Sequence, residues 1–232
     1  MRKLQLWMLV ILICGACLQT SCSQVDNAAL SEKEQFEYEM TAALADARIY
    51  GPPTQTLAQK VAERYGGRVT ELNYKSRESA TRKCITDNSR PYELKDLART
   101  TIAAGWDSIE IKPVISSLVE AAHDWGLSTR HKHQTSDYGY WGDLVNLKFE
   151  RLSTEVQVKT YPMFYATNPG YVVLSVLGDS IYTVIRSKSK VEPGLFHHYY
   201  EIIRADTSSE ATVEHYKRLS KEYHACFEHI RD

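Results

Sequence analysis

The sequence lacks an excess of charge of either sign: 28 lysines and arginines face 29 acidic residues, a formal net charge of −1. It therefore gives no electrostatic reason to expect a nucleic acid partner. The apolar run at residues 4–18 is shorter than the roughly 20 apolar residues that a membrane-spanning helix needs. Cysteines are few, and beyond the N-terminal segment only Cys84 and Cys226 remain, which leaves their pairing open. What is left is a globular chain of 232 residues, long enough for one sizeable core.

The N-terminal segment has the pattern of an export signal, with two basic residues, an apolar run and a short polar stretch. We expect a signal peptide at residues 1–22, a tether at residues 23–30 and a single domain over residues 31–232. Cys17 and Cys22 each follow small or apolar residues, as lipidated cysteines do, so the expectation is lipidation at one of them or simple cleavage. The protein is thus expected in the periplasm, on a membrane through a lipid anchor, or secreted.

Two helical patterns follow the tether. Ser31 begins a capping pattern, and apolar residues then recur at helical spacing until Gly51-Pro52-Pro53, which is expected to end the helix. A second helix is expected over residues 54–65, ending at Gly66-Gly67. Both patterns are typical of packing elements.

A basic triplet follows a short strand. Lys75, Ser79 and Lys83 are spaced by four, so a helix that starts near Ser76 places them on one face near its N-terminus. Two cations, a hydroxyl and the free amides of a helix start form a cradle for a polyphosphate. A solvated basic face is the alternative interpretation of the same pattern.

A helix is expected over residues 107–125 and a strand over residues 127–134. His131 and His133 alternate outward on this strand. The sequence offers no third ligand at a recognisable spacing, so we expect exposed strand residues rather than a zinc site.

Residues 137–160 have the pattern of a loop, a strand, a tight turn at residues 150–153 and a second strand. The two-residue period of the second strand places an acid, an amide and a base on one face and two valines in a core. The polar face comprises Glu155, Gln157 and Lys159. The alternative is the solvated face of an ordinary hairpin.

Two carboxylates can converge across one sheet. Asp96 lies at the entry of one strand and Glu155 lies on a later strand. Magnesium commonly uses one or two carboxylates together with substrate phosphates, so this sparse pair suits a nucleotide-metal site.

In this order the pieces resemble the alarmone synthetase domain of RelA/SpoT proteins. The most specific piece is Glu-Val-Gln-Val-Lys-Thr at residues 155–160, which is similar to the family's Glu-[Ile/Val]-Gln-[Ile/Val]-[Arg/Lys]-Thr. Before it come the basic triplet, the aspartate at a strand entry and Gly139-Tyr140. The resemblance covers residues 71–170. It extends more loosely to residues 197–204, which are similar to the terminal helix of small toxin-like members.

The resemblance implies an α/β (α+β) fold with a mixed, mostly antiparallel central sheet flanked by helices, as in nucleotidyltransferase-like synthetase domains. It implies that Lys75, Ser79 and Lys83 hold the phosphates of ATP. Asp96 and Glu155 would carry Mg²⁺, the implied cofactor.

The same resemblance implies which residues bind the acceptor nucleotide. Tyr140 would stack on the acceptor base, and Gln157 and Lys159 would also contact nucleotide. Glu155 would in addition help to deprotonate the attacking 3′-hydroxyl. The implied enzyme is a diphosphotransferase that moves pyrophosphate from ATP to a purine nucleotide, with GTP or GDP as the favoured acceptor.

Export would separate such an enzyme from cytoplasmic nucleotides. Three explanations stay open: an effector or toxin that acts inside another cell, an N-terminus that does not export, or a degenerate domain that only binds nucleotide. A lipid-anchored interaction protein without chemistry is an alternative of a different class.

Three positions depart from the family pattern. Asn73 and Thr101 stand where arginines are usual, although Arg99 is nearby, and Leu144 stands where a histidine is frequent. These departures favour the alternatives without catalysis, whereas the intact carboxylate pair favours the enzyme. The sequence leaves the oligomeric state open.

Overall fold

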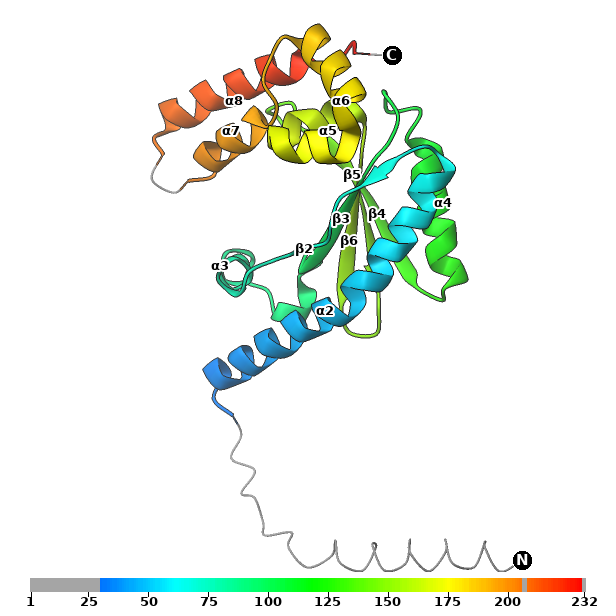
Figure 1. Ribbon diagram of the computed structural model, residues 1–232. Coiled ribbons are helices and arrows are strands. Elements are labelled where there is room, and N and C mark those ends of the chain that lie inside the picture. The colour runs from blue at the N-terminus through cyan, green and yellow to red at the C-terminus, as the bar shows by residue number, and fades with distance from the viewer. Residues whose placement is uncertain (1–29, 206–207, 231–232) are drawn as a thin grey trace, which may run out of the picture. The chain divides into compact units, whose positions relative to one another are not determined.

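The computed structural model describes residues 30–205 and 208–230 (Figure 1). The expected signal peptide and all but the last residue of the expected tether lie outside the described residues, and so do Cys17 and Cys22. Within the described ranges, no helix is both long and apolar enough to cross a membrane. The sheet and the helices that cover it belong to one compact unit, residues 36–232.

The first element of the described residues is one long helix, α2 (Glu32–Arg64), so the expected stop at Pro52-Pro53 is wrong. Proline lacks the N–H donor of a helix interior. Two threonine hydroxyls add hydrogen bonds to the helix around the prolines: Thr54 donates to the Tyr50 carbonyl (2.8 Å), and Thr56 donates to the Pro52 carbonyl (3.0 Å). Apolar residues are buried both before and after the prolines, and this packing holds the helix together across them.

Six strands form the sheet, in the order β1-β3-β6-β5-β4, with β2 also paired to β3. Only the β3–β6 pair is parallel, so the predicted mixed, mostly antiparallel sheet is confirmed. The strands are β1 (Arg68–Val69), β2 (Asn73–Tyr74), β3 (Ala98–Ala103), β4 (Ser128–Thr135), β5 (Trp141–Lys148) and β6 (Ser153–Lys159).

The other helices connect or follow these strands. They are α3 (Arg77–Asp87), a 3-10 turn η1 (Pro91–Glu93), α4 (Lys112–Asp124), α5 (Tyr161–Thr167), α6 (Gly170–Ser189), α7 (Leu195–Ile203) and α8 (Glu210–Ala225). The start of α3 is as predicted, because the Ser76 hydroxyl accepts the N–H of Ser79. Helix α4 begins later than expected. The Asp107 carboxylate accepts the N–H groups of Ile109 and Glu110, which favours a turn over a helix there.

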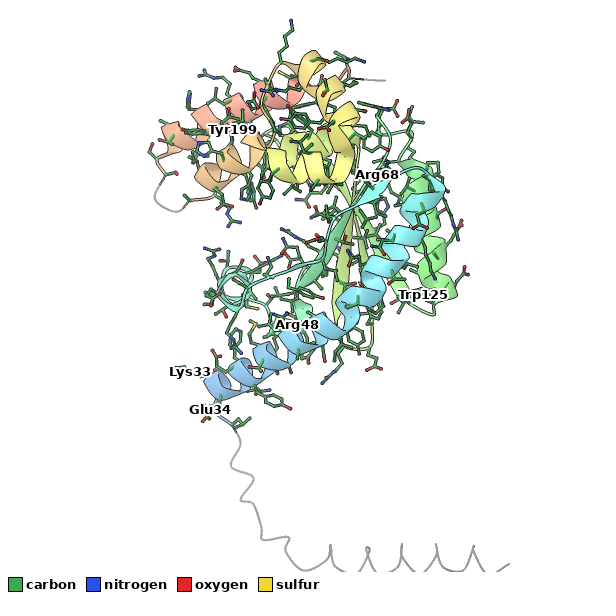
Figure 2. The ribbon with its side chains drawn as sticks, in the orientation of Figure 1. Lys33, Glu34, Arg48, Arg68, Trp125 and Tyr199 are labelled. Carbon is green, nitrogen blue, oxygen red and sulfur yellow. The ribbon has the colours of Figure 1, made fainter. Side chains whose placement is uncertain are left out.

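The sheet has two different faces. On one face, α2 and α4 pack over a core that includes Val145, Val156 and Val158, each fully buried. The two-residue period predicted this for Val156 and Val158. Figure 1 shows α3 on the opposite side of the sheet from α4. Helices α5 to α8 form a second, aromatic-rich cluster, and Figure 2 marks Tyr199 on α7 within it.

Cys84 and Cys226, the two cysteines of the described residues, are both unpaired thiols. Cys84 is a buried residue of α3, whereas Cys226 is exposed directly after α8.

Candidate nucleotide site

The face of the sheet opposite α2 and α4 carries a polar row that crosses four strands. Arg99 on β3 pairs with Glu155 on β6, Glu155 with Asn146 on β5, and Asn146 with Arg130 on β4. Directly paired residues point to the same face. The next row is Thr101, Gln157, Leu144 and Lys132. The predicted acid-amide-base face of β6 therefore lies at the centre of a wider polar surface.

The centre of this surface is largely shielded from water. Glu155 is 7 % exposed and Asn146 is 8 % exposed. One Glu155 carboxylate oxygen accepts a hydrogen bond from the Gln157 amide at 2.9 Å. The Asn146 side-chain N–H₂ is buried and finds no partner among the residues that the structure describes. A buried donor without a partner is costly, which suggests that a ligand group completes it.

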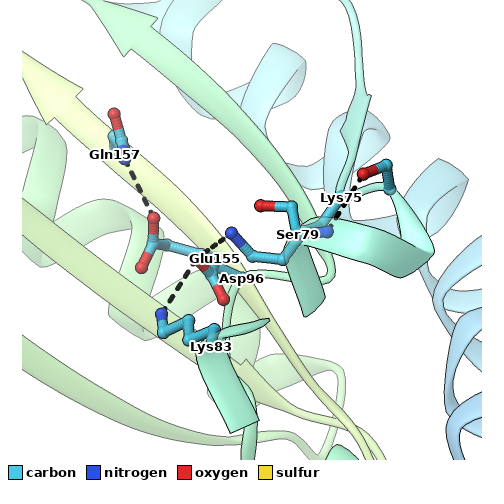
Figure 3. A network of polar contacts seen from close by, with 7 residues as sticks. Lys75, Ser79, Lys83, Asp96, Glu155 and Gln157 are labelled. Atoms are coloured by element: carbon cyan, nitrogen blue, oxygen red, sulfur yellow. Dashed lines mark hydrogen bonds and ion pairs between the residues drawn. The ribbon is translucent and has the colours of Figure 1, made fainter. Parts of the chain in front are cut away.

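Asp96 joins the basic triplet to this surface. Its Oδ2 lies 2.9 Å from Lys75 Nζ and 3.0 Å from Lys83 Nζ (Figure 3). Burial opposes ionisation of the carboxyl, but the two ammonium groups outweigh it, so the pKa of Asp96 lies below its usual range. Ser79 lies one helical turn before Lys83 on α3. The structure thus brings three predicted residues into direct contact and places the fourth beside them.

The residues fit a divalent cation. Asp96 Oδ1 is buried and has no hydrogen-bond partner in the described part of the chain, although its other oxygen has two. Asp96 stands two residues before β3, whose parallel neighbour β6 carries Glu155. No group of three or more His, Cys, Asp and Glu side chains in the described ranges could hold a metal. A pair of carboxylates that shares Mg²⁺ with substrate phosphates needs no third acid.

Tyr140 lies at the other end of the surface, where β5 begins. Its hydroxyl lies over Gly142, since a Cβ built on that glycine would be 2.9 Å from the oxygen. The ring stacks on Phe196 of α7, with centroids 5.2 Å apart and an interplanar angle of 18°. Lys159 Nζ lies 5.6 Å from the ring centroid. Burial, followed by the charge of Glu155, raises the pKa of Tyr140, so its hydroxyl stays protonated.

The side chain of Lys159 is buried, 7 % exposed. Its ammonium group donates to the Thr167 hydroxyl at 3.0 Å. Burial and then the charge of Arg99 lower its pKa to about 7, although Glu155 acts in the opposite direction. The charge of Lys159 is therefore poised to change near neutral pH.

Helix α8 holds the loop that carries Tyr140. The Ser220 hydroxyl donates to the Tyr138 carbonyl at 2.8 Å, and Lys217 lies 3.3 Å from Asp137. Gly139 has φ +91°, and a Cβ built there would be 2.9 Å from the Cβ of His224. The C-terminal helix thus fixes the conformation of this loop.

His131 and His133 gather around a carboxylate that the sequence spacing did not reveal. His131 Nε2 lies 2.7 Å and His133 Nδ1 lies 3.2 Å from Asp143 Oδ1 on the neighbouring strand. These are contacts to one shared oxygen on the face of the sheet that bears the core valines. The cluster is therefore separate from the polar surface.

Several candidate residues escaped the sequence analysis. Asn146, Arg130 and Lys132 could have been found from strand alternation once the pairing was known, because they share a face with Glu155 and Gln157. No sequence pattern pointed to Phe196 or His224 as site residues, since only the tertiary fold brings α7 and α8 to the loop that holds Tyr140. The departure at Thr101 is partly offset by Arg99, which lies two residues earlier on the same face of β3.

No protein-family model matches the chain. A curated relative is the (p)ppApp synthetase toxin Tas1 of Pseudomonas aeruginosa (strain UCBPP-PA14), 32% identical over 149 residues, which are 62% of this chain and 32% of Tas1. The chain thus spans about a third of the length of the curated relative that it matches. The crystal structure of the complex between the type VI effector Tas1 and its immunity protein aligns with a TM-score of 0.64 at 24% identity, covering 82% of this chain and 96% of that chain.

These comparisons bear on two predictions. The homology to Tas1 confirms the predicted resemblance to an alarmone synthetase with toxin-like relatives. The structural likeness confirms the predicted synthetase-like fold.

Proposed function

We propose that this protein transfers pyrophosphate from ATP to the 3′-hydroxyl of a purine nucleotide. The observation that carries the proposal is the junction of α3 with the parallel β3–β6 pair. There Lys75 and Lys83 hold Asp96 just before the start of β3, and Glu155 lies on the neighbouring strand (Figure 3). The homology to a (p)ppApp synthetase supports the same reaction class.

The residues suit the needs of this reaction. In-line attack on the β-phosphorus requires the two substrates to be aligned, the phosphate charge to be neutralised and the attacking hydroxyl to be deprotonated. Lys75, Lys83 and Ser79 would bind the phosphates of ATP. Glu155 would accept the proton of the 3′-hydroxyl, and its hydrogen bond from Gln157 fixes the carboxylate in place.

Asp96 and Glu155 would hold Mg²⁺. The bound ion would neutralise charge on the transferred phosphates. The unpartnered Asp96 Oδ1 supports this role, because a metal ion would complete that oxygen.

The acceptor would lie towards Tyr140, Gln157 and Lys159. The motif resemblance favours GTP or GDP, whereas the name of Tas1 favours an adenine nucleotide. Arg130 and Lys132 lie on the same face as Glu155 and Gln157, and their charges suit the 5′-phosphates of either acceptor.

We also propose a toxin role, which the name of Tas1 supports. We further propose that residues 1–22 direct export, which would carry the enzyme out of the producing cell. The second candidate function is nucleotide binding without transfer, which Asn73 and Leu144 favour because they replace side chains usual in the family.

The test is an acceptor panel with the full chain. The protein is incubated with ATP and Mg²⁺ and with AMP, ADP, GDP or GTP in turn, and products are resolved by chromatography with and without a chelator. The proposal predicts a 3′-pyrophosphorylated product for at least one acceptor and none with the chelator. Nucleotide binding without any product would establish the second candidate instead.

A further inference from the structure

Phe196 of α7 packs directly against the ring of Tyr140. It is 8 % exposed, and its ring is nearly parallel to that of Tyr140, with an interplanar angle of 18°. It also stacks against Tyr138 and Tyr200, with centroids 6.0 Å and 5.8 Å away, and meets the edge of His224 at 5.0 Å. Phe196 is therefore the inner ring of an aromatic stack that ends in Tyr140.

The outer end of this stack faces the polar surface. Tyr140 lies over Gly142 on the face of the sheet that carries Glu155, and Lys159 Nζ approaches its ring at 5.6 Å. If Tyr140 is the platform for the acceptor base, Phe196 already covers one face of that platform. An acceptor base that stacks on this covered face must either expel Phe196 or insert between the two rings.

We propose that the acceptor purine inserts between Tyr140 and Phe196, so that Phe196 is the second ring of the base-binding site. This inference rests on the proposed function. Two rings that enclose a base stand about 7 Å apart, twice the contact distance of stacked carbon atoms. The two rings are already in stacking contact, with centroids 5.2 Å apart, so their planes must separate by about one ring thickness, about 3.5 Å, to admit a base. The near-parallel planes already have the orientation that a base requires.

Insertion disturbs fewer contacts than expulsion. The contacts of Phe196 with Tyr138, Tyr200 and His224 do not involve the Tyr140 ring, whereas expulsion of Phe196 would break all of them. Expulsion would transfer a buried aromatic ring into water, which is unfavourable. Insertion exchanges one ring–ring contact for two ring–base contacts.

Two stacking rings select by the size of the base. A purine covers more of both rings than a pyrimidine, whereas every base offers a π-face to stack on. Tyr140 and Phe196 would thus favour purines over pyrimidines without distinguishing adenine from guanine. Any such distinction would come from polar groups at the edge of the base.

The experiment measures binding of AMP and GDP to the full chain by calorimetry, without ATP, so that its readout does not depend on turnover. Phe196→Leu keeps an apolar side chain but removes the ring, and Phe196→Tyr restores a ring. Phe227→Leu is the matched control, because Phe227 is 6 % exposed in the same cluster and its ring contacts are to Tyr165 and Tyr223.

We expect Phe196→Leu to weaken purine binding by about 5- to 150-fold, the range for stacking on one ring. Phe196→Tyr should bind within about 3-fold of the wild type, and Phe227→Leu should match the wild type. Tighter or unchanged binding in Phe196→Leu, or an equal loss in Phe227→Leu, would overturn this inference while leaving the proposed function intact. A wild type that binds no purine nucleotide would overturn both.

Discussion

Arg99 on β3 lies directly opposite Glu155 on β6 in the parallel register of the two strands. The position where alarmone synthetases usually carry an arginine holds Thr101, one alternation further along the same face. A guanidinium is therefore present on the strand, but it is shifted towards the carboxylate. This shift keeps a positive charge beside Glu155 and weakens the case that the missing arginine marks a degenerate domain.

Glu155→Gln should reduce pyrophosphate transfer by about 10²- to 10⁴-fold, the usual contribution of a general base. The amide can still accept the hydrogen bond from Gln157, so the fold and the affinity for ATP should change little. Turnover and ATP binding are measured on the same preparation. Glu120→Gln, on the exposed surface of α4, is the matched control and should retain full activity. Undiminished turnover in Glu155→Gln would remove the residue from the mechanism.

Lys83→Met should raise the KM for ATP by about 10- to 100-fold, because a charge-assisted hydrogen bond to a phosphate is lost. The KM for the acceptor should stay within about 3-fold of the wild-type value, since Lys83 lies on α3 and Tyr140 lies at the start of β5. Lys112→Met, exposed at the start of α4, is the control. Equal changes in both KM values would argue against a donor site at α3.

Lys159→Met should change how stability depends on pH. The pKa of Lys159 is lowered to about 7 in the fold, against an ordinary value of 10.5, so the folded lysine is neutral in this window while the unfolded lysine is charged. The unfolded chain then binds more protons, and stability should rise with pH by up to about 1.4 kcal/mol per unit between these values. As the pH falls towards 7, this contribution is lost.

Urea unfolding at pH 7, 8 and 9 measures this effect as the difference between wild type and Lys159→Met. The free energy of unfolding of the variant should lack this rise with pH, because methionine does not titrate. Parallel stability profiles for the two proteins would show that Lys159 is not a neutral buried amine in this range.

Gly139→Ala should raise the KM for the acceptor and leave the KM for ATP unchanged. The new Cβ meets the Cβ of His224 at 2.9 Å and must displace the loop that carries Tyr140. Gly126→Ala isolates the clash from backbone strain, because Gly126 also has a positive φ (+74°) but open space around its Cβ position. Both variants should lose about 1–3 kcal/mol of stability, but only the first should affect the acceptor. If Gly126→Ala shifted the acceptor KM equally, α8 would not be holding the loop.

The sequence predicted those parts of the site that depend on local pattern. The cap at Ser76 and the alternation of Glu155, Gln157 and Lys159 are local properties, and the structure has them as expected. The helix break at Pro52-Pro53 was wrong, because tertiary burial on both sides outweighed a local signal.

Long-range contacts could not be predicted in the same way. The two lysines on Asp96 required the pairing of β3 with its neighbours, and the stack of Phe196 on Tyr140 required α7 to pack against a loop more than fifty residues earlier. Neither contact produces a periodic pattern in the sequence. The order of the motifs did suffice to predict the synthetase-like fold.

The fate of each phosphate of ATP tests the central claim most directly. The full chain is incubated with an acceptor that gives product and with a trace of ATP labelled at either the α- or the γ-phosphate. Pyrophosphate transfer predicts that the γ-label appears in the acceptor product and the α-label in AMP. An α-label found in a nucleotidylated acceptor, or a γ-label released only as orthophosphate, would contradict pyrophosphate transfer.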